Sequence, residues 1–154
     1  MDLKLGDNAP AFKLATDGGR EVSVSGLKGH PFVLYFYPKD NTSGCTKEAV
    51  EFTKLFKKFN ELGVRVIGVS KDGVASHDKF KTNYKLNLTL ASDPETKVAQ
   101  AYGVWVEKSM YGRKYMGMER ATFLVDTKGK IRAIWRKVKV PGHPEAVLAA
   151  AKAL

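Results

Sequence analysis

The chain has 154 residues, 44% of them hydrophobic and 27% charged, a composition typical of one globular domain, here expected to span residues 1–154. The net charge of +10 raises the idea of an acidic partner, but the basic residues are spread along the chain, which favours a solvated lysine surface and no nucleic-acid partner. No apolar run reaches membrane-spanning length, and the start MDLKLGDNAPAF lacks a signal pattern. We therefore expect no membrane partner. The single cysteine excludes an internal disulfide framework, and we expect a cytoplasmic protein.

Strand patterns occupy the first part of the chain. Residues 11–27, AFKLATDGGREVSVSGL, predict two short strands around a Gly-Gly turn. The apolar run PFVLYFYP at 31–38 is typical of a central strand that is buried on both faces. A helical pattern follows from Cys45 to Leu62, and Gly63 then supplies a C-terminal stop.

Strands and helices alternate along the rest of the chain. The patterns predict a buried strand at 64–70, a helix at 76–86, a short helix at 93–104 that begins at an Asp-Pro pair, a β-hairpin at 120–138 and an amphipathic helix at 142–154. Alternating β and α elements imply parallel strands, and the late hairpin adds antiparallel ones. We therefore expect an α/β fold of thioredoxin-like layout, with a mixed central sheet, helices on both faces and an N-terminal β-hairpin.

The only cysteine, Cys45, lies at the start of the first long helix. On a helical wheel it falls at the edge of the apolar side, which is formed by Ala49, Phe52, Leu55, Phe56, Phe59 and Leu62. The acid Glu48 falls on the same side, whereas Val50 falls almost opposite its centre. Free N–H groups and the positive end of the helix dipole favour a thiolate in the first turn, and a thiolate is the reactive form of cysteine.

Two interpretations of Cys45 compete. A lone cysteine is most often a small buried hydrophobic residue. An inert cysteine, however, has no need of the residues that precede it: Pro38 can fix the turn and shield the thiol, Thr42 offers a hydroxyl to a substrate oxygen or to the sulfur, and Gly44 allows a ligand to approach the backbone. Each of two residues also has a purely structural interpretation: Thr42 is a candidate helix cap, and Glu48 is an acid that the helix dipole favours in the first turn.

These residues resemble those of a known family. Pro38, Thr42 and Cys45 match the Pro-x-x-x-Thr-x-x-Cys motif of the peroxiredoxins, and the chain is similar to the bacterioferritin-comigratory, or Q-type, subfamily. The likeness runs over nearly the full length and includes the segments GDNAPAF, YFYPKDNT and ERATFLVD. In the last of these, Arg120 matches the active-site arginine of the family. The resemblance implies a thioredoxin-like fold, in agreement with the predicted order of elements.

The resemblance also implies a thiol peroxidase. Cys45 would attack a peroxide as the thiolate and become a sulfenic acid, while Thr42, Arg120 and backbone N–H groups near Cys45 hold the peroxide oxygens. Because Glu48 lies on the inner side of its helix, we expect it to orient Arg120. This chemistry requires no metal, flavin or haem, and the three histidines are too scattered to suggest a metal site.

The sequence departs from the subfamily at Val50, where many members carry a second, resolving cysteine. The chain therefore looks like a one-cysteine member, whose sulfenic acid must be reduced by an external thiol (thioredoxin, glutaredoxin or glutathione) or by Cys45 of a second chain. We expect a monomer or a weak homodimer. A non-enzymatic redox sensor or binding module is the alternative function, and the absence of Cys-x-x-Cys disfavours a thiol–disulfide oxidoreductase.

Overall fold

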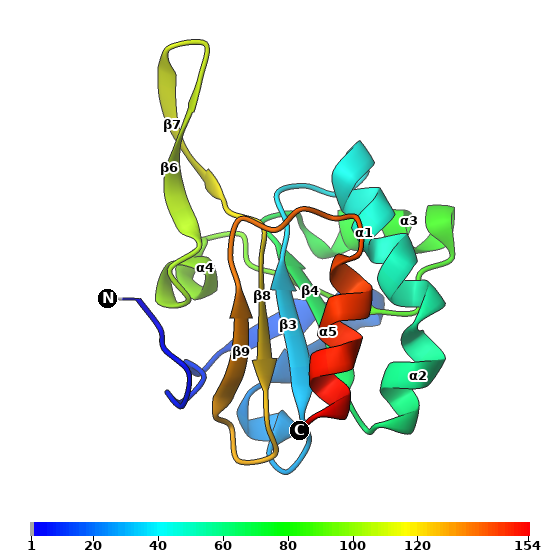
Figure 1. Cartoon of the computed structure of the whole chain (residues 1–154). Helices are drawn as coiled ribbons and strands as arrows, with labels where there is room; N and C mark the ends of the chain where they lie inside the picture. The colour runs from blue at the N-terminus through cyan, green and yellow to red at the C-terminus, as the bar shows by residue number, and fades with distance from the viewer. Residues whose placement is uncertain (1) are drawn as a thin grey trace.

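A mixed β-sheet forms the centre of the computed structural model, which describes residues 2–154 (Figure 1). Its strands are β1 (Lys13–Thr16), β2 (Arg20–Ser23), β3 (Phe32–Phe36), β4 (Arg65–Ser70), β5 (Thr89–Ser92), β8 (Ala121–Val125) and β9 (Ile131–Trp135). They lie in the order β2-β1-β5-β4-β3-β8-β9. The pairs β3–β4 and β4–β5 are parallel, whereas β8 runs antiparallel to β3. The predicted parallel core, the late hairpin β8–β9 and the N-terminal hairpin β1–β2 are all present.

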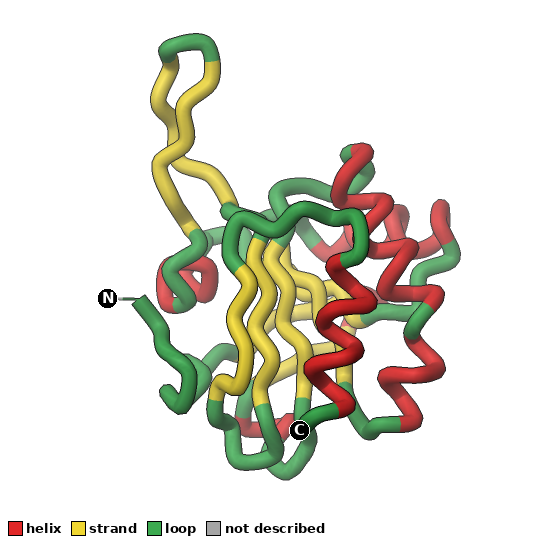
Figure 2. Tube along the Cα trace, viewed as in Figure 1, coloured by secondary structure: helices red, strands yellow, loops and turns green. Residues whose placement is uncertain are grey.

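Helices cover both faces of the sheet, as predicted (Figure 2). They are the 3-10 helices η1 (Asp17–Gly19) and η2 (Ser25–Leu27), and the α-helices α1 (Ser43–Lys54), α2 (Phe56–Glu61), α3 (Val74–Tyr84), α4 (Lys97–Ala101) and α5 (His143–Lys152). Within β3, Val33 and Tyr35 belong to the apolar cluster that includes side chains of α1, α2, α3 and α5. Leu34 and Phe36 point the other way, into the cluster that includes α4 and η2. The two-residue period of a strand thus explains why its whole apolar run is buried.

The helix predicted from Cys45 to Leu62 is in fact two helices. It starts at Ser43 and breaks at Leu55, whose ψ of 0° is not helical, before α2 continues the chain. The break shifts the angular phase of the residues that follow, so Phe56 and Leu62 are exposed although the wheel placed them on the apolar side. Val50, which the wheel placed almost opposite the apolar centre, is half-buried and packs against the core cluster that includes side chains of α5. Gly63, at φ 71°, ends α2 as predicted.

A third β-hairpin was not predicted. It consists of β6 (Trp105–Met110) and β7 (Arg113–Met118), and it projects from the body of the protein (Figure 1). Its two-residue turn places Tyr111 and Gly112 at positive φ, and tyrosine is an unusual residue there, so the turn lacks the usual Asn-Gly or Asp-Gly signature. The short strand β5 was missed as well, because its four residues carry no alternating pattern.

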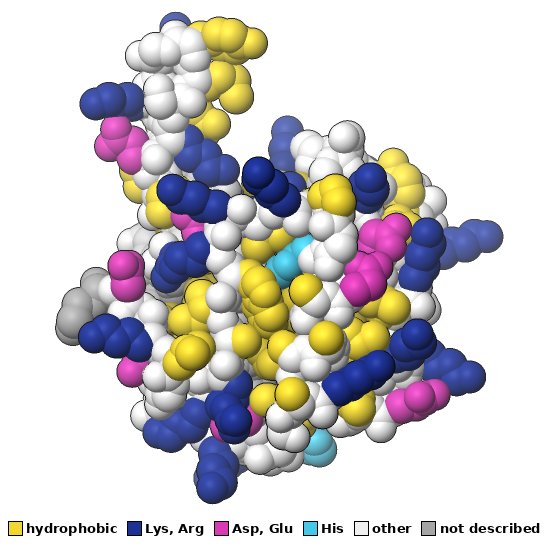
Figure 3. Space-filling model, viewed as in Figure 1, with side chains coloured by type: hydrophobic (Ala, Val, Ile, Leu, Met, Phe, Trp, Pro, Cys, Tyr) yellow, Lys and Arg dark blue, Asp and Glu magenta, His cyan; other side chains and the backbone are white. Residues whose placement is uncertain are grey.

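The surface is basic over a wide area. Figure 3 shows Lys and Arg side chains spread across the visible face, with acidic side chains between them and no single basic tract. This distribution agrees with a solvated lysine surface. Within residues 2–154, none of the helices has both the length and the apolar character needed to cross a membrane.

The contact between Tyr35 and Gly68 provides a test of core packing. The two residues are partners in the β3–β4 ladder, and a methyl group added at Gly68 would lie 2.7 Å from a ring carbon of the fully buried Tyr35. We expect Gly68→Ala to lower the free energy of unfolding by about 2 kcal/mol, because an overpacked core forces side chains off their rotamers. Urea denaturation measures the loss. Gly73→Ala is the control, since a methyl group there meets no atom within 4 Å, and equal losses in both variants would contradict the prediction.

Candidate active site

The sheet register places two distant segments beside each other. Cys45 lies in the first turn of α1, just beyond the carboxyl end of β3, and is 1% exposed. In the antiparallel β3–β8 ladder, Phe36 pairs with Ala121. Arg120, the residue before Ala121, therefore lies at the sheet edge where the chain leaves β3 and turns toward Cys45. Ligands bind at this edge in α/β folds.

The guanidinium of Arg120 joins Cys45 to Glu48. Its Nη2 donates a hydrogen bond to Cys45 Sγ at 3.3 Å, and its Nη1 donates to Glu48 Oε1 at 2.6 Å. The Glu48 side chain is fully buried, and that of Arg120 is 17% exposed. The predicted proximity of Glu48 and Arg120 is thus present, and the planar fork of one arginine reaches both partners at once.

Burial governs the charge state of Glu48. Desolvation raises the pKa of its carboxyl to about 7, and the charge and hydrogen bond of Arg120 offset only part of that rise. Burial by itself lowers the pKa of Arg120, but Glu48 and Cys45 outweigh this effect and raise it above its ordinary value. Glu48 Oε2 has no hydrogen-bond partner among residues 2–154. The carboxylate is thus held by one strong contact rather than by a saturated network.

Gly44 leaves room for the Arg120 guanidinium. A methyl group at this position would lie 3.2 Å from Arg120 Nη2, closer than nine in ten real contacts of that kind, so the guanidinium would have to shift. The sequence suggested that Gly44 lets a ligand approach the backbone. In the structure, the group that approaches is the guanidinium itself, and Gly44 leaves room for it beside the sulfur.

Pro38 and Thr42 lie on the outer side of the loop between β3 and α1. Both are exposed, and Thr42 Oγ1 donates a hydrogen bond to the Lys39 carbonyl at 2.8 Å. Thr42 is the N-cap residue of α1, but its side chain makes no capping hydrogen bond. Its lone pairs stay available to accept a hydrogen bond from a ligand. The shielding of Cys45 by Pro38 stays a prediction.

The histidines do not form a metal site. No group of three or more potential metal-ligating side chains is found within the described residues 2–154. His143 Nε2 contacts Thr122 Oγ1 at 2.7 Å, and burial together with the Arg120 charge lowers the pKa of His143 to about 4. His143 is therefore neutral at physiological pH. His77 is buried against Asp40, and His30 is exposed.

Comparisons with known proteins agree with this geometry. The model of the AhpC/TSA family matches residues 5–134. The chain belongs to the AhpC/TSA family. Peroxiredoxin Bcp of Bacillus subtilis is 46% identical over 143 residues, which is 93% of this chain and 91% of the relative.

Solved structures give the same assignment. The peroxiredoxin Q of Xylella fastidiosa, solved as a cysteine-to-serine mutant, superposes with a TM-score of 0.94 at 38% identity, covering 99% of this chain and 98% of that one. The bacterioferritin comigratory protein of Xanthomonas campestris gives a TM-score of 0.89 at 43% identity, with 92% and 90% covered. The expected membership in the Q-type peroxiredoxins and the thioredoxin-like fold are both confirmed.

The sequence analysis did not predict two features of this AhpC/TSA member. Lys108, on the unpredicted hairpin, donates a hydrogen bond to the Met118 carbonyl two residues before Arg120. Burial, with the charge of Arg120, lowers the pKa of Lys108. The second is the buried contact of Asp40 with His77. Residues 105–110 and 113–118 do not alternate between apolar and polar side chains, so the sequence gives no clear signal for the hairpin. No local pattern links Asp40 to a residue 37 positions away either.

The raised pKa of Glu48 predicts how stability depends on pH. An ordinary glutamate titrates near 4.5 and Glu48 near 7, so between these values the unfolded chain releases a proton that the folded chain retains. The contribution of Glu48 to the free energy of unfolding therefore declines as pH rises from 4.5 to 7. At about 1.4 kcal/mol per pKa unit, the total is on the order of 3 kcal/mol.

Glu48→Gln cannot titrate and should lack this decline. Urea denaturation across pH 4.5–7.5 measures the difference in free energy of unfolding between the parent and the variant. The contributions of groups that titrate in both chains cancel in this difference. Glu51→Gln, one turn further along α1 and in contact with solvent, is the control and should run parallel to the parent. A parallel curve for Glu48→Gln as well would contradict the prediction.

Proposed function

We propose that this protein is a one-cysteine thiol peroxidase that reduces hydrogen peroxide and organic hydroperoxides through Cys45. The observation that carries the proposal is the hydrogen bond from Arg120 Nη2 to Cys45 Sγ at the amino-terminal end of α1. Family membership supports it, and the Xanthomonas campestris relative was solved in a study of alkyl peroxide reduction. The family assignment favours an enzyme over a non-enzymatic redox sensor or binding module.

Oxidation of Cys45 is the first step. A lone pair of the thiolate sulfur forms a bond to the distal peroxide oxygen, and the O–O bond breaks. Its electron pair leaves with the other oxygen as an alkoxide or hydroxide, which takes up a proton to become alcohol or water. The sulfur becomes a sulfenic acid.

Charge moves during this step from the sulfur to the departing oxygen, and the site offers donors for both positions. Arg120 already points an N–H at the sulfur, and its guanidinium is held in place by Glu48. Backbone N–H groups of the first turn of α1 lie at the same end of the helix. The Thr42 hydroxyl, which donates its proton to the Lys39 carbonyl, can accept a hydrogen bond from the peroxide there. Donors that are oriented before reaction stabilise the transition state without reorganising, which is the main catalytic contribution we assign to them.

Regeneration requires thiols from outside the chain. A first thiol attacks the sulfenic sulfur, which forms a mixed disulfide with Cys45 and releases water. A second thiol attacks this disulfide and frees Cys45, so the two external thiols end as a disulfide. Thioredoxin, glutaredoxin or glutathione fits this role. Because Cys45 is the only cysteine, its resolution within one chain is excluded.

Trapping of the sulfenic acid tests the proposed function. The reduced protein is mixed with one equivalent of hydrogen peroxide at neutral pH in the presence of a sulfenic-acid trap, and its intact mass is measured over time. Rapid and complete trapping at Cys45 is expected. Oxidation no faster than that of free cysteine would contradict the proposal.

Substitution of Arg120 by lysine tests the role of the guanidinium. Lysine keeps the charge but cannot hold Glu48 and the sulfur with two separate N–H groups. Since one oriented donor is worth about 100-fold or more in rate, we expect Arg120→Lys to slow the reaction with peroxide by at least tenfold. Stopped-flow kinetics measures the rate constant. Arg113→Lys on the exposed part of β7 is the matched control, and an unchanged Arg120→Lys rate would refute the role.

Overoxidation should follow from the absence of a second cysteine. Without an internal thiol to consume it, the sulfenic acid of Cys45 persists and reacts with further peroxide to give sulfinic acid. Intact mass after excess peroxide should show the addition of two oxygens, and prior addition of an external thiol should suppress it. A product that stops at one oxygen under excess peroxide would argue against this expectation.

A further inference from the structure

The loop between β3 and α1 is anchored by one buried charge. Its residues Pro38, Lys39, Asn41 and Thr42 are exposed, whereas Asp40 is only 4% exposed. A buried carboxylate is costly unless it is paired and hydrogen-bonded. The contacts of Asp40 therefore determine how this loop, which leads directly to Cys45, is held.

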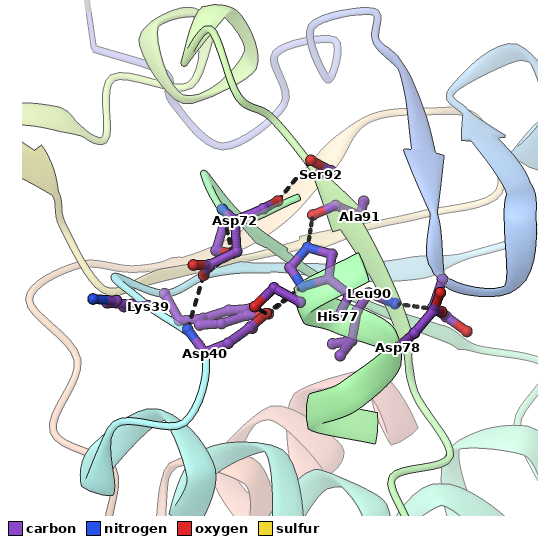
Figure 4. A network of polar contacts seen from close by, with 12 residues as sticks. Lys39, Asp40, Asp72, His77, Asp78, Leu90, Ala91 and Ser92 are labelled. Carbon is purple, nitrogen blue, oxygen red and sulfur yellow. Dashed lines mark hydrogen bonds and ion pairs between the residues drawn. The ribbon is translucent and has the colours of Figure 1, made fainter. Parts of the chain in front are cut away.

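Three side chains donate to the Asp40 carboxylate. Oδ1 accepts from the Tyr37 hydroxyl at 2.6 Å, and Oδ2 lies 2.8 Å from Ser76 Oγ and 2.7 Å from His77 Nδ1. Ser76 and His77 belong to α3, so the carboxylate ties the loop to a helix more than 30 residues away. Figure 4 shows the imidazole of His77 between Asp40 and Ala91.

The backbone of the loop is tied to the same region. The N–H of Asp40 donates to Asp72 Oδ2 at 2.8 Å, and the Ser70 hydroxyl donates to the same oxygen at 2.7 Å. Ser92 Oγ in turn donates to the Asp72 carbonyl at 2.6 Å. Both the side chain and the backbone of Asp40 are thus fixed by groups at the ends of β4 and β5 and on α3.

The partners of His77 determine its charge. Nε2 lies 2.9 Å from the Ala91 carbonyl, which can only accept, so this nitrogen carries a proton. Nδ1 faces a carboxylate that already accepts two hydroxyl hydrogen bonds, an arrangement that stabilises the ionised acid. The second nitrogen is therefore a donor too, and His77 is an imidazolium.

The pKa directions agree with this charge state. Burial by itself lowers the pKa of His77, but the hydrogen bond and charge of Asp40, with a further contribution from Asp72, raise it above its ordinary value. Burial by itself raises the pKa of Asp40, and hydrogen bonds from His77 and Tyr37 reverse that effect and lower it.

We propose that Asp40 and His77 form a buried ion pair that positions the peroxide-binding loop for Cys45. Asn41 follows Asp40 at φ 62°, a left-handed conformation that asparagine tolerates better than most residues and that turns the chain toward α1. Thr42 comes next, and its carbonyl accepts the Thr46 N–H in the first turn of α1. The pair thus fixes where the chain enters α1 and where the Thr42 hydroxyl lies. This inference rests on the proposed peroxidase function.

A hydrolytic role for the same residues does not fit the contacts. Serine, histidine and aspartate lie together here, but the Ser76 hydroxyl contacts the carboxylate and not the imidazole, so the imidazole cannot serve as its general base. His77 is fully buried, and both of its ring nitrogens are occupied. His77 therefore acts through Asp40 as a positioning residue, without contact with the substrate.

Two measurements test the ion pair. The first is the ¹⁵N NMR signature of the His77 ring in the reduced parent protein at pH 7.5, where an ordinary histidine with a pKa near ~6.5 is mostly neutral. We expect both ring nitrogens to be protonated, and the signal to be assigned by its loss in His77→Gln. If His77→Gln folds poorly, the loss of the other two histidine signals in His30→Gln and His143→Gln assigns the remaining one to His77, so the parent spectrum still tests the charge state.

The second measurement compares two reagents for Cys45. The reaction with hydrogen peroxide depends on the Arg120 donor and on the placement of the Thr42 hydroxyl, whereas alkylation by iodoacetamide needs only an accessible thiolate. We expect His77→Gln to lower the rate constant with peroxide about tenfold, because misplacing a reacting group by an ångström costs roughly 100-fold and the loop should shift by less. The rate constant of alkylation should stay within about twofold of the parent value. Asp40→Asn should behave in the same way. His30→Gln, an exposed histidine remote from the loop, should change neither rate.

Three results would overturn the proposal: a neutral His77 ring in the parent, a peroxide rate that His77→Gln leaves unchanged, or an equal fall with both reagents. The last would mean that the substitution loosens the whole region. A parent protein that reacts no faster with peroxide than free cysteine would instead refute the proposed peroxidase function. The two failures are therefore distinguishable.

Discussion

The contact of the Arg120 guanidinium with Glu48 and with the Cys45 sulfur is the interaction on which the site depends. A fully buried carboxylate loses its hydration, and one close cation compensates for this loss only in part, as the raised pKa of Glu48 shows. Such a pair is weak evidence for stability. Its value lies in geometry, because a guanidinium held at one end by a carboxylate presents its other N–H groups in a fixed direction.

The fold supplies this geometry through strand register. Arg120 and Cys45 are 75 positions apart, and they meet because β8 pairs with β3 so that Ala121 lies opposite Phe36. A shift of one residue in this pairing would turn the side chains of β8 to the opposite faces of the sheet. The buried side chains of β3 and β8 therefore define the position of the site as well as the stability of the sheet.

The sequence predicts much of this arrangement. The features that it did not predict were missed for identifiable physical reasons. The apolar run of β3 and the alternation of elements predict the parallel core, and the inner position of Glu48 on its helix predicts a partner for Arg120. The break at Leu55 was missed because a helical wheel assumes an unbroken helix. The β6–β7 hairpin was missed because a tyrosine occupies a left-handed turn position. The pair of Asp40 and His77 depends on the packing of α3 against a loop, and local patterns carry no information about that contact.

Cys45 lies between two ion pairs of different character. Glu48 and Arg120 connect α1 to the start of β8, and Glu48 keeps one oxygen without a hydrogen-bond partner among residues 2–154. Asp40 and His77 connect the preceding loop to α3, and there both carboxylate oxygens and both ring nitrogens are engaged. A second cysteine at position 50 would have to reach Cys45 by unwinding α1, which would carry Glu48 away from Arg120. A chain with valine at position 50 needs no such step to form an internal disulfide, so its chemistry does not require α1 to unwind or Glu48 to leave Arg120.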